Sequence, residues 1–325
     1  MQNLSSKPHT GRIESRNLTI GLVYLSQTLI GILGNFSLIF YYAFLSFTTS
    51  RLKSTDLILK HLIMANSLLI LSKGVPQTIS SLGLKDFLSD LGCKIVFYAH
   101  RVGRGVSISS TCILSVFQAI TISPMDTRYA GFKFKAPRYV GIICTLCWVL
   151  FMIVNIIVLM YVTAKRSNRN ITNQKDLGFC VGANYGKPQK ILHSVVFSLP
   201  DVLFMGLMIW SSSFMVFILL RHKQQVQHIH TTRVYQKCSS VDRATKTILL
   251  LVSTFVCFYM ISSITQVIII VNNSPTWFLV NLATLFGAGF PTVSPFLLIT
   301  QDSNASRFNL HWILTRKSSH LIRSM

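Results

Sequence analysis

The chain has 325 residues, half of them apolar, and only 12% of them are charged, compared with about a quarter in ordinary soluble domains. A net charge of +22 suits a nucleic-acid binder, but whole stretches of the chain carry no charge at all, which argues against a basic surface on a soluble domain. Basic loops between long apolar segments are instead typical of a membrane protein, so we expect no nucleic-acid partner.

Five apolar segments come first along the chain, each long enough to cross a bilayer as a helix, which takes about 20 residues. They are predicted over residues 18–47, 57–82, 94–122, 139–164 and 191–220. The second is the weakest, because it contains Lys60, His61 and Lys73. Lys60 can extend to one interface, and Lys73 lies well toward the other.

The stretch 247–300 contains no charged residue. As one helix it would be about 80 Å long, far beyond the roughly 30 Å hydrocarbon core, so it must turn back. Turn-forming residues stand midway, at Asn272, Asn273, Ser274 and Pro275. The sequence therefore predicts an all-α membrane protein, a seven-transmembrane helix bundle over residues 18–300. Residues 1–17 are an extracellular N-terminus and residues 301–325 a cytoplasmic tail.

The predicted orientation rests on the ends of the spans. The first 17 residues are polar and lack the apolar core of a cleavable signal peptide, so the first span acts as its own insertion signal. With the N-terminus outside, the inner loops and tail hold a modest excess of Lys and Arg.

Cysteine positions support the same topology. Five of the seven cysteines lie within spans or in an inner loop, namely Cys112, Cys144, Cys147, Cys257 and Cys238. The Cys144-x-x-Cys147 spacing suits a redox or metal pair, but without a second pair in a lipid-embedded helix we interpret these as buried thiols and expect no metal site. Cys93 and Cys180 face the oxidising side, so we predict that they form a disulfide. The sequon at Asn170 in the same outer loop predicts glycosylation there.

Seven spans with such a bridge describe a G protein-coupled receptor, and Gly34, Asn35 and Trp148 match its rhodopsin-like pattern. Other marks of that class are missing. Asn66 replaces the aspartate of span two, which argues against a sodium site. Phe117 and Gln118 stand in the region of the acidic-Arg-Tyr triplet. Span six lacks Cys-Trp-x-Pro, and residues 290–296 replace Asn-Pro-x-x-Tyr.

This set of departures resembles the vomeronasal type-1 receptors. The matching stretches are SKGVPQT (72–78), HRVGRGVS (100–107), SVFQAITISP (115–124) and FPTVSP (290–295). The resemblance implies a pheromone receptor in the plasma membrane of vomeronasal neurons that couples to Gi-type G proteins. Loops 124–138 and 221–246 would then face the G protein, with membrane lipid beside the basic second loop. The candidate residues are Arg128, Arg138, Arg221, Lys223 and Lys246. Histidines in the second loop could hold a metal, but a solvated basic loop is the better interpretation.

Span three carries the strongest candidates for a ligand site. Placing an arginine near the bilayer centre costs about 2.5–3.5 kcal/mol on insertion scales, so such a residue should face the bundle interior, a wet cavity or a partner. His100 and Arg104 are four residues apart and share one helix face, whereas Arg101 is turned about 100° away. Arg101 and Ser107 in span three and Gln266 in span six are further candidate ligand-binding residues.

Asp201 in span five is the only carboxylate deep in any span, and either Arg104 or Arg101 could pair with it. Two interpretations stay open. His100, Arg104 and Asp201 could line a cavity that binds small apolar molecules with an acidic group, such as sulfated steroids, since arginine binds sulfate and carboxylate through two parallel hydrogen bonds. Alternatively, Arg104 and Asp201 could form a buried ion pair between spans three and five.

Other classes fit the sequence less well. A bitter taste-type receptor shares the missing triplet but typically lacks the bridge predicted between Cys93 and Cys180. A transporter or channel should show repeated halves, and none is found. An intramembrane aspartyl protease needs two carboxylates, and only Asp201 lies within the membrane, so we expect neither an enzyme nor a cofactor.

Overall fold

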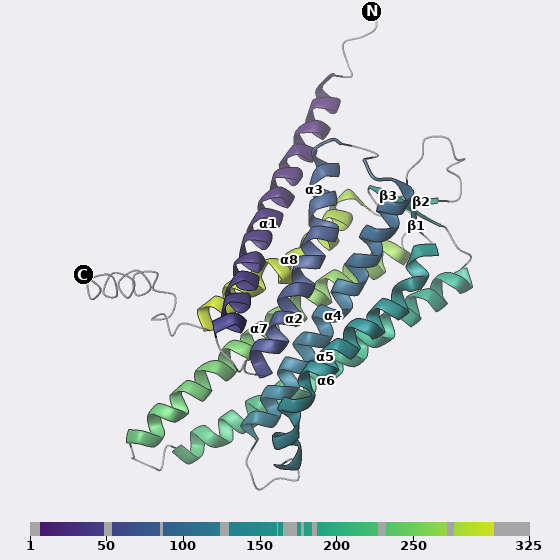
Figure 1. The fold of residues 1–325 in the computed structure, drawn as a ribbon. Coiled ribbons are helices and arrows are strands. Elements are labelled where there is room, and N and C mark those ends of the chain that lie inside the picture. Colours follow the sequence, from purple (N-terminus) through teal and green to yellow (C-terminus); the bar gives the residue numbers. More distant parts are fainter. Residues whose placement is uncertain are drawn as a thin grey trace, which may run out of the picture.

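The computed structural model describes residues 7–48, 54–84, 87–123, 130–160, 162–164, 174–176, 179–183, 187–226, 232–271 and 276–301. Within these residues the chain is a bundle of long helices that lie roughly alongside one another (Figure 1). Seven of them are long and apolar enough to cross a membrane, which confirms the predicted number of spans. A short three-stranded sheet lies beside one end of the bundle.

The helices follow the predicted spans in chain order. They are α1 (Lys7–Thr48), α2 (Ser54–Leu69) continued by a π-helical turn (Ile70–Gly74) and α3 (Val75–Ser81), α4 (Asp90–Ile122), α5 (Ala130–Val154) continued by a 3-10 helix (Asn155–Met160), α6 (Lys187–Val226), α7 (Thr232–Val271) and α8 (Trp277–Gln301). The predicted division of the last apolar stretch into two spans is confirmed, because α7 ends at Val271 and α8 begins at Trp277. The predicted turn residues, 272–275, lie outside the described residues.

Helix α4 lies at the centre of the bundle and packs against α2, α5 and α6. Small residues dominate its buried stretch, among them Gly103, Gly105, Ser107, Ser109 and Ser110. In a membrane, where lipid tails are as apolar as leucine, small side chains let helices approach closely enough to pack. A Cβ at Gly103 would stand only 3.2 Å from the Ala65 carbonyl oxygen of α2.

The sequence suggested one continuous α-helix for span two, but the structure divides this span. The Val75 N–H donates to the Ile70 carbonyl, five residues back, which marks a π-helical turn over Ile70–Gly74. Pro76 follows directly and has no N–H to continue a regular hydrogen-bond ladder. A π-turn adds a residue to the helix and changes the direction in which the residues around it point. Lys73 lies within this turn.

The end of span four also differs from the prediction. The helix was expected to continue to Ala164, but α5 gives way to a 3-10 helix at Asn155, and Val162–Ala164 form strand β1. Strands β2 (Gln174–Asp176) and β3 (Cys180–Ala183) complete an antiparallel sheet in the order β1-β3-β2. The predicted disulfide between Cys93 and Cys180 is present and ties the first turn of α4 to β3.

Helices extend further than predicted at the opposite end of the bundle. Residues 221–246 were expected to form a loop, but α6 continues to Val226 and α7 already begins at Thr232. Residues 124–138 were also expected as a loop, and α5 begins at Ala130. At the start of the chain, α1 begins at Lys7, well ahead of the predicted first span.

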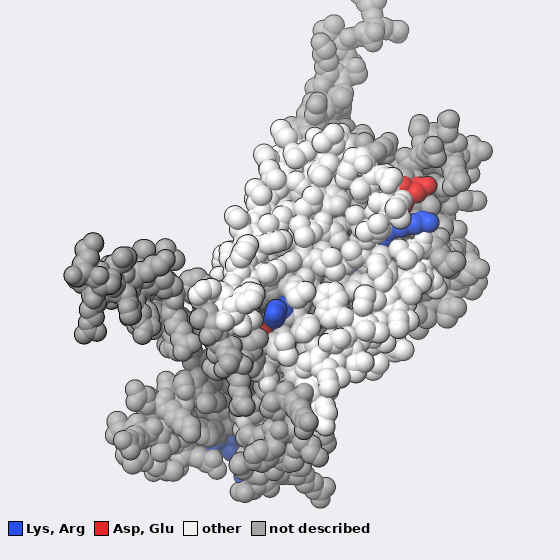
Figure 2. Space-filling view, viewed as in Figure 1, with Lys and Arg blue, Asp and Glu red and all other residues white. Residues whose placement is uncertain are grey.

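The outer surface of the bundle suits contact with lipid. Large apolar side chains such as Phe40, Phe47 and Trp210 are exposed over more than 70% of their surface. Figure 2 shows one face on which the described residues are almost all uncharged, with Lys, Arg, Asp and Glu confined to small spots. Such a continuous apolar surface would be unusual on a soluble monomer and is expected for helices embedded in a bilayer.

Candidate functional site

A cavity lies inside the bundle where α4 faces α7 and α8. The unfilled space between its side chains, counted together with its open side, is about 390 Å³, but the centre of a water-sized molecule can occupy only about 30 Å³ of it, so the cavity is narrow. The polar part of its wall consists of His100, Arg104, Ser107, Tyr259 and Ser262. The apolar part consists of Leu69, Phe255, Phe258, Phe286, Phe290 and Pro291.

The aromatic wall is held by ring contacts across α7 and α8. Phe255 and Phe290 meet edge to face with their centroids 4.6 Å apart, and Phe258 lies 5.7 Å from Phe286. Phe255 also stacks on Tyr259, one turn along α7, at 5.6 Å. Aromatic pairs at such distances add favourable energy beyond their buried area, so this wall is a preformed apolar surface.

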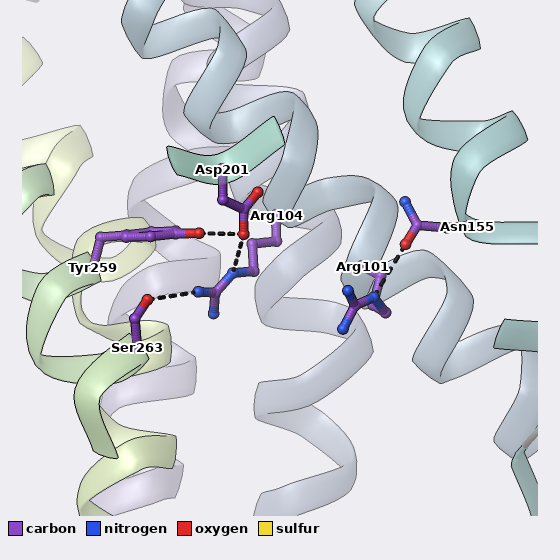
Figure 3. Close-up of polar contacts among 6 residues, drawn as sticks. All are labelled: Arg101, Arg104, Asn155, Asp201, Tyr259 and Ser263. Carbon is purple, nitrogen blue, oxygen red and sulfur yellow. Dashed lines mark hydrogen bonds and ion pairs between the residues drawn. The ribbon is translucent and has the colours of Figure 1, made fainter. Parts of the chain in front are cut away.

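Arg104 joins three helices at the edge of this cavity (Figure 3). Its Nε lies 3.8 Å from Oδ2 of Asp201 in α6, and its Nη2 donates to the Ser263 hydroxyl of α7 at 3.2 Å. The guanidinium carbon stands 4.4 Å from the centroid of the Tyr259 ring, a cation–π contact. Tyr259 in turn donates its hydroxyl to Asp201. The Arg104 charge is therefore paired and hydrogen-bonded within the protein.

Arg101 points away from this group, as the helical spacing predicted (Figure 3). Its Nε donates to the Asn155 side-chain oxygen at 3.0 Å, in the 3-10 segment that follows α5. Asn155 is itself fixed, because its amide donates to the Phe151 carbonyl at 2.8 Å. Arg101 thus links spans three and four rather than lining the cavity, and of the two possible partners of Asp201 the structure selects Arg104.

His100 lines the cavity, and Lys73 lies behind its wall, next to the lining residue Gly287. His100 shares the cavity wall with Arg104, and the buried Nδ1 of His100 has no hydrogen-bond partner among the described residues. The Lys73 ammonium lies near Gly287, another cavity residue, 3.7 Å from the point where a Cβ on that glycine would stand. Lys73 was expected well toward one interface and was not a candidate site residue. The π-helical turn that carries it could not be read from the apolar pattern of span two.

Of the remaining candidate site residues, Ser107 is buried, and the side chains of the others lie outside the described part of the structure. Ser107 lines the cavity, but its hydroxyl donates to Oδ1 of Asn66 at 2.8 Å. The Asn66 amide donates to the Ser294 hydroxyl at 2.9 Å, so α2, α4 and α8 share a neutral polar network. Gln266 belongs to α7, but its side chain lies outside the described part of the structure, as does the sequon residue Asn170.

The basic residues expected to face a G protein lie toward the end of the bundle opposite the disulfide. Arg221 near the end of α6 and Lys246 in the first half of α7 are exposed. Arg138 is in α5 and Lys223 in α6, with side chains that are not described, and Arg128 falls outside the described residues.

Comparison with known proteins decides the family. A family model described as "Vomeronasal organ pheromone receptor family" matches residues 18–310. Human vomeronasal type-1 receptor 4 is 50% identical over 298 residues, which cover 92% of this chain and 99% of that receptor. This chain belongs to the vomeronasal type-1 receptor family. The resemblance seen in the four sequence stretches is thereby confirmed.

Other comparisons agree with this membership. Human vomeronasal type-1 receptor 2 is 51% identical over 283 residues, covering 87% of this chain and 72% of that receptor. Squid rhodopsin shares the fold, with a TM-score of 0.70 and 14% sequence identity over 93% of this chain and 82% of rhodopsin. The vomeronasal type-1 receptor described here is thus a pheromone-type G protein-coupled receptor, with a small-molecule ligand and a G protein as partners. It is a multi-pass plasma-membrane protein and not an enzyme.

Proposed function

We propose that this receptor detects small, largely apolar molecules that carry an acidic group, such as sulfated steroids, and that they bind in the cavity between α4, α7 and α8. The observation that carries the proposal is the pairing of an aromatic wall with an excess of positive charge. Lys73, Arg101 and Arg104 act electrostatically on His100 at this level of the bundle, against one carboxylate, Asp201.

An excess of buried positive charge is costly unless an anion compensates it. A ligand sulfate or carboxylate placed beside these side chains would supply that charge, while Phe255, Phe258 and Phe290 would contact an apolar skeleton. His100, whose Nδ1 has no hydrogen-bond partner within the described part of the chain, and Arg104 are the proposed ligand-contacting residues of α4. Ser107, Asp201 and Gln266 remain proposed members of the same site. The ion pair of Arg104 with Asp201 would hold α4 and α6 in a fixed position beside the ligand.

We further propose that the end bearing the disulfide faces outward, with the N-terminus outside, and that the opposite end activates Gi-type G proteins. Disulfides persist in oxidising surroundings, which supports this orientation for Cys93 and Cys180. The exposed Arg221 and Lys246 would then meet the G protein and anionic lipid on the cytoplasmic side. Gi coupling itself is proposed from the family resemblance.

The test is a cell assay in which each ligand is paired with its uncharged counterpart. Cells expressing the full chain are given steroid sulfates and the matching unsulfated steroids, with calcium and cAMP as readouts. We expect responses to the sulfates at lower concentrations, a fall in cAMP, and loss of both responses after pertussis toxin. Equal responses to each sulfate and its parent alcohol would contradict the ligand proposal, and toxin-resistant signalling would contradict Gi coupling.

A further inference from the structure

Arg104, which lines the cavity, and Lys73, which lies next to the cavity residue Gly287, differ in how far neighbouring groups compensate their charge. Arg104 has the carboxylate of Asp201, the hydroxyl of Ser263 and the ring of Tyr259 around its guanidinium. The Lys73 ammonium has no hydrogen bond and no ion pair among the described residues. Its electrostatic neighbours include Arg104 and His100, and among the residues that the structure describes none of them is a carboxylate.

The position of Lys73 is fixed by the backbone turn that carries it. It sits in the π-helical turn Ile70–Gly74, where Ser72 bonds back to the Leu68 carbonyl at 2.6 Å and Gly74 packs tightly against Thr28 of α1. From this turn the ammonium reaches across the bundle to Gly287 of α8. A lysine near a helix end normally extends to the interface, where its head is hydrated. This one is turned inward.

Gly287 leaves room at the point where Lys73 arrives. A Cβ there would meet the Ser262 hydroxyl at 3.5 Å and the Lys73 Nζ at 3.7 Å, both ordinary contact distances. Because glycine has no Cβ, that place is free of protein atoms, and it borders the cavity lined by His100 and Ser262. An ammonium and a hydroxyl therefore meet beside Gly287, and the His100 imidazole lines the same cavity; donors of this kind suit the oxygens of an anionic group.

We infer that Lys73 makes the principal contact to the acidic group of the ligand, beside Gly287 and Ser262, while Arg104 contacts the ligand at the edge of the site and holds α6 and α7 in place through Asp201 and Tyr259. This assignment rests on the proposed binding of acidic ligands and names the side chain that recognises them. It follows from charge pairing: an incoming anion would have to compete with Asp201 for Arg104, but meets no competitor at Lys73. Lys73 thus determines specificity, and Arg104 positions the helices.

The experiment compares four variants in the full receptor, each normalised to its surface amount: Lys73→Met, Lys73→Arg, Lys60→Met and Gly287→Ala. Responses are recorded to steroid sulfates and to the matching unsulfated steroids. Lys73→Met keeps an unbranched apolar chain but removes the charge, and Lys60→Met makes the same change earlier in the same span. Gly287→Ala puts a methyl group at contact distance from Lys73 and Ser262, so it fills the space without a steric clash.

We expect Lys73→Met to raise the half-maximal concentration for sulfates at least about 10-fold, the loss of a hydrogen bond to a charged group, with the unsulfated steroids little affected. Lys73→Arg should retain most of the preference, Gly287→Ala should weaken it, and Lys60→Met should leave it unchanged. If wild-type receptor prefers sulfates and Lys73→Met keeps that preference, the assignment to Lys73 is wrong and the proposed function stands. If wild type shows no preference for sulfates, the proposed function fails and the assignment fails with it.

Discussion

Nε of Arg104 in α4 lies 3.8 Å from Oδ2 of Asp201 in α6, and the same carboxylate oxygen accepts a hydrogen bond from Tyr259 in α7. One carboxylate therefore joins three spans at the level of the cavity. Both side chains are mostly buried, with 21% and 19% of their surfaces exposed. Removing one partner of such a pair leaves the other charge without compensation, which costs more than the pair itself contributes.

We predict that Asp201→Asn lowers the free energy of unfolding by about 1.5–3 kcal/mol, because Arg104 loses its ion-pair partner and the Tyr259 hydroxyl loses a charged acceptor, while the shape of the side chain is kept. Thermal unfolding of the purified receptor in detergent measures the change. Arg104→Gln should destabilise similarly, and the double variant should lose less than the sum of the two, since the two residues interact directly. Strict additivity would show that the pair does not couple the helices. In cells, these variants should weaken responses to acidic and neutral ligands alike.

The partner of Asp201 illustrates what sequence can and cannot predict here. Long charge-free segments predicted the spans, and helical spacing placed His100 and Arg104 on one face with Arg101 turned away. The choice of Arg104 over Arg101 depended on how α6 and α7 pack around α4, which no local pattern encodes. Because a π-turn changes side-chain direction without changing composition, the inward position of Lys73 was likewise not predictable.

The ends of the helices were less predictable than their middles. Helices α6 and α7 continue past the apolar segment into basic sequence, because helix propensity does not require apolar residues. The reverse holds after α5, where residues 155–160 of the largely apolar segment form a 3-10 helix and residues 162–164 form a strand. Pairing with β3, which the disulfide ties to α4, there replaces continuation of the helix.

The disulfide should contribute strongly to stability. It closes a loop across 87 positions of sequence and joins β3 to the start of α4. We predict that Cys93→Ser and Cys180→Ser each lower the free energy of unfolding by about 2–4 kcal/mol, with the double variant no worse than either single one. Thermal unfolding and surface expression give the measurement. Cys257→Ser changes an exposed free cysteine and serves as the control, expected to have little effect. Further loss in the double variant would mean that the two cysteines act independently.

The neutral network around Asn66 gives a third prediction. Its amide donates to Ser294 and its carbonyl oxygen accepts from Ser107, linking α2, α4 and α8 beside the cavity. Asn66→Leu keeps a similar volume but leaves both hydroxyls without this partner, so we expect a loss of about 0.6–2 kcal/mol in unfolding free energy. Adding Ser107→Ala and Ser294→Ala to Asn66→Leu removes the stranded hydroxyls and should recover part of the loss. No recovery would indicate that packing at position 66, rather than hydrogen bonding, is what matters.

A fourth prediction concerns the close approach of α4 and α5 at Gly105. A Cβ at this position would stand 2.1 Å from the Phe151 ring of α5, so Phe151 would have to move if any side chain were introduced. We predict that Gly105→Ala lowers the unfolding free energy by about 1–3 kcal/mol, the usual cost of overpacking, and reduces surface expression. Gly206→Ala in α6 is the matched control, because its Cβ would meet nothing within 4 Å. Combining Gly105→Ala with Phe151→Leu frees the space that the new methyl group needs, so stability should return toward that of Phe151→Leu alone. If Gly105→Ala were no worse than Gly206→Ala, the two helices would lie further apart than the structure places them.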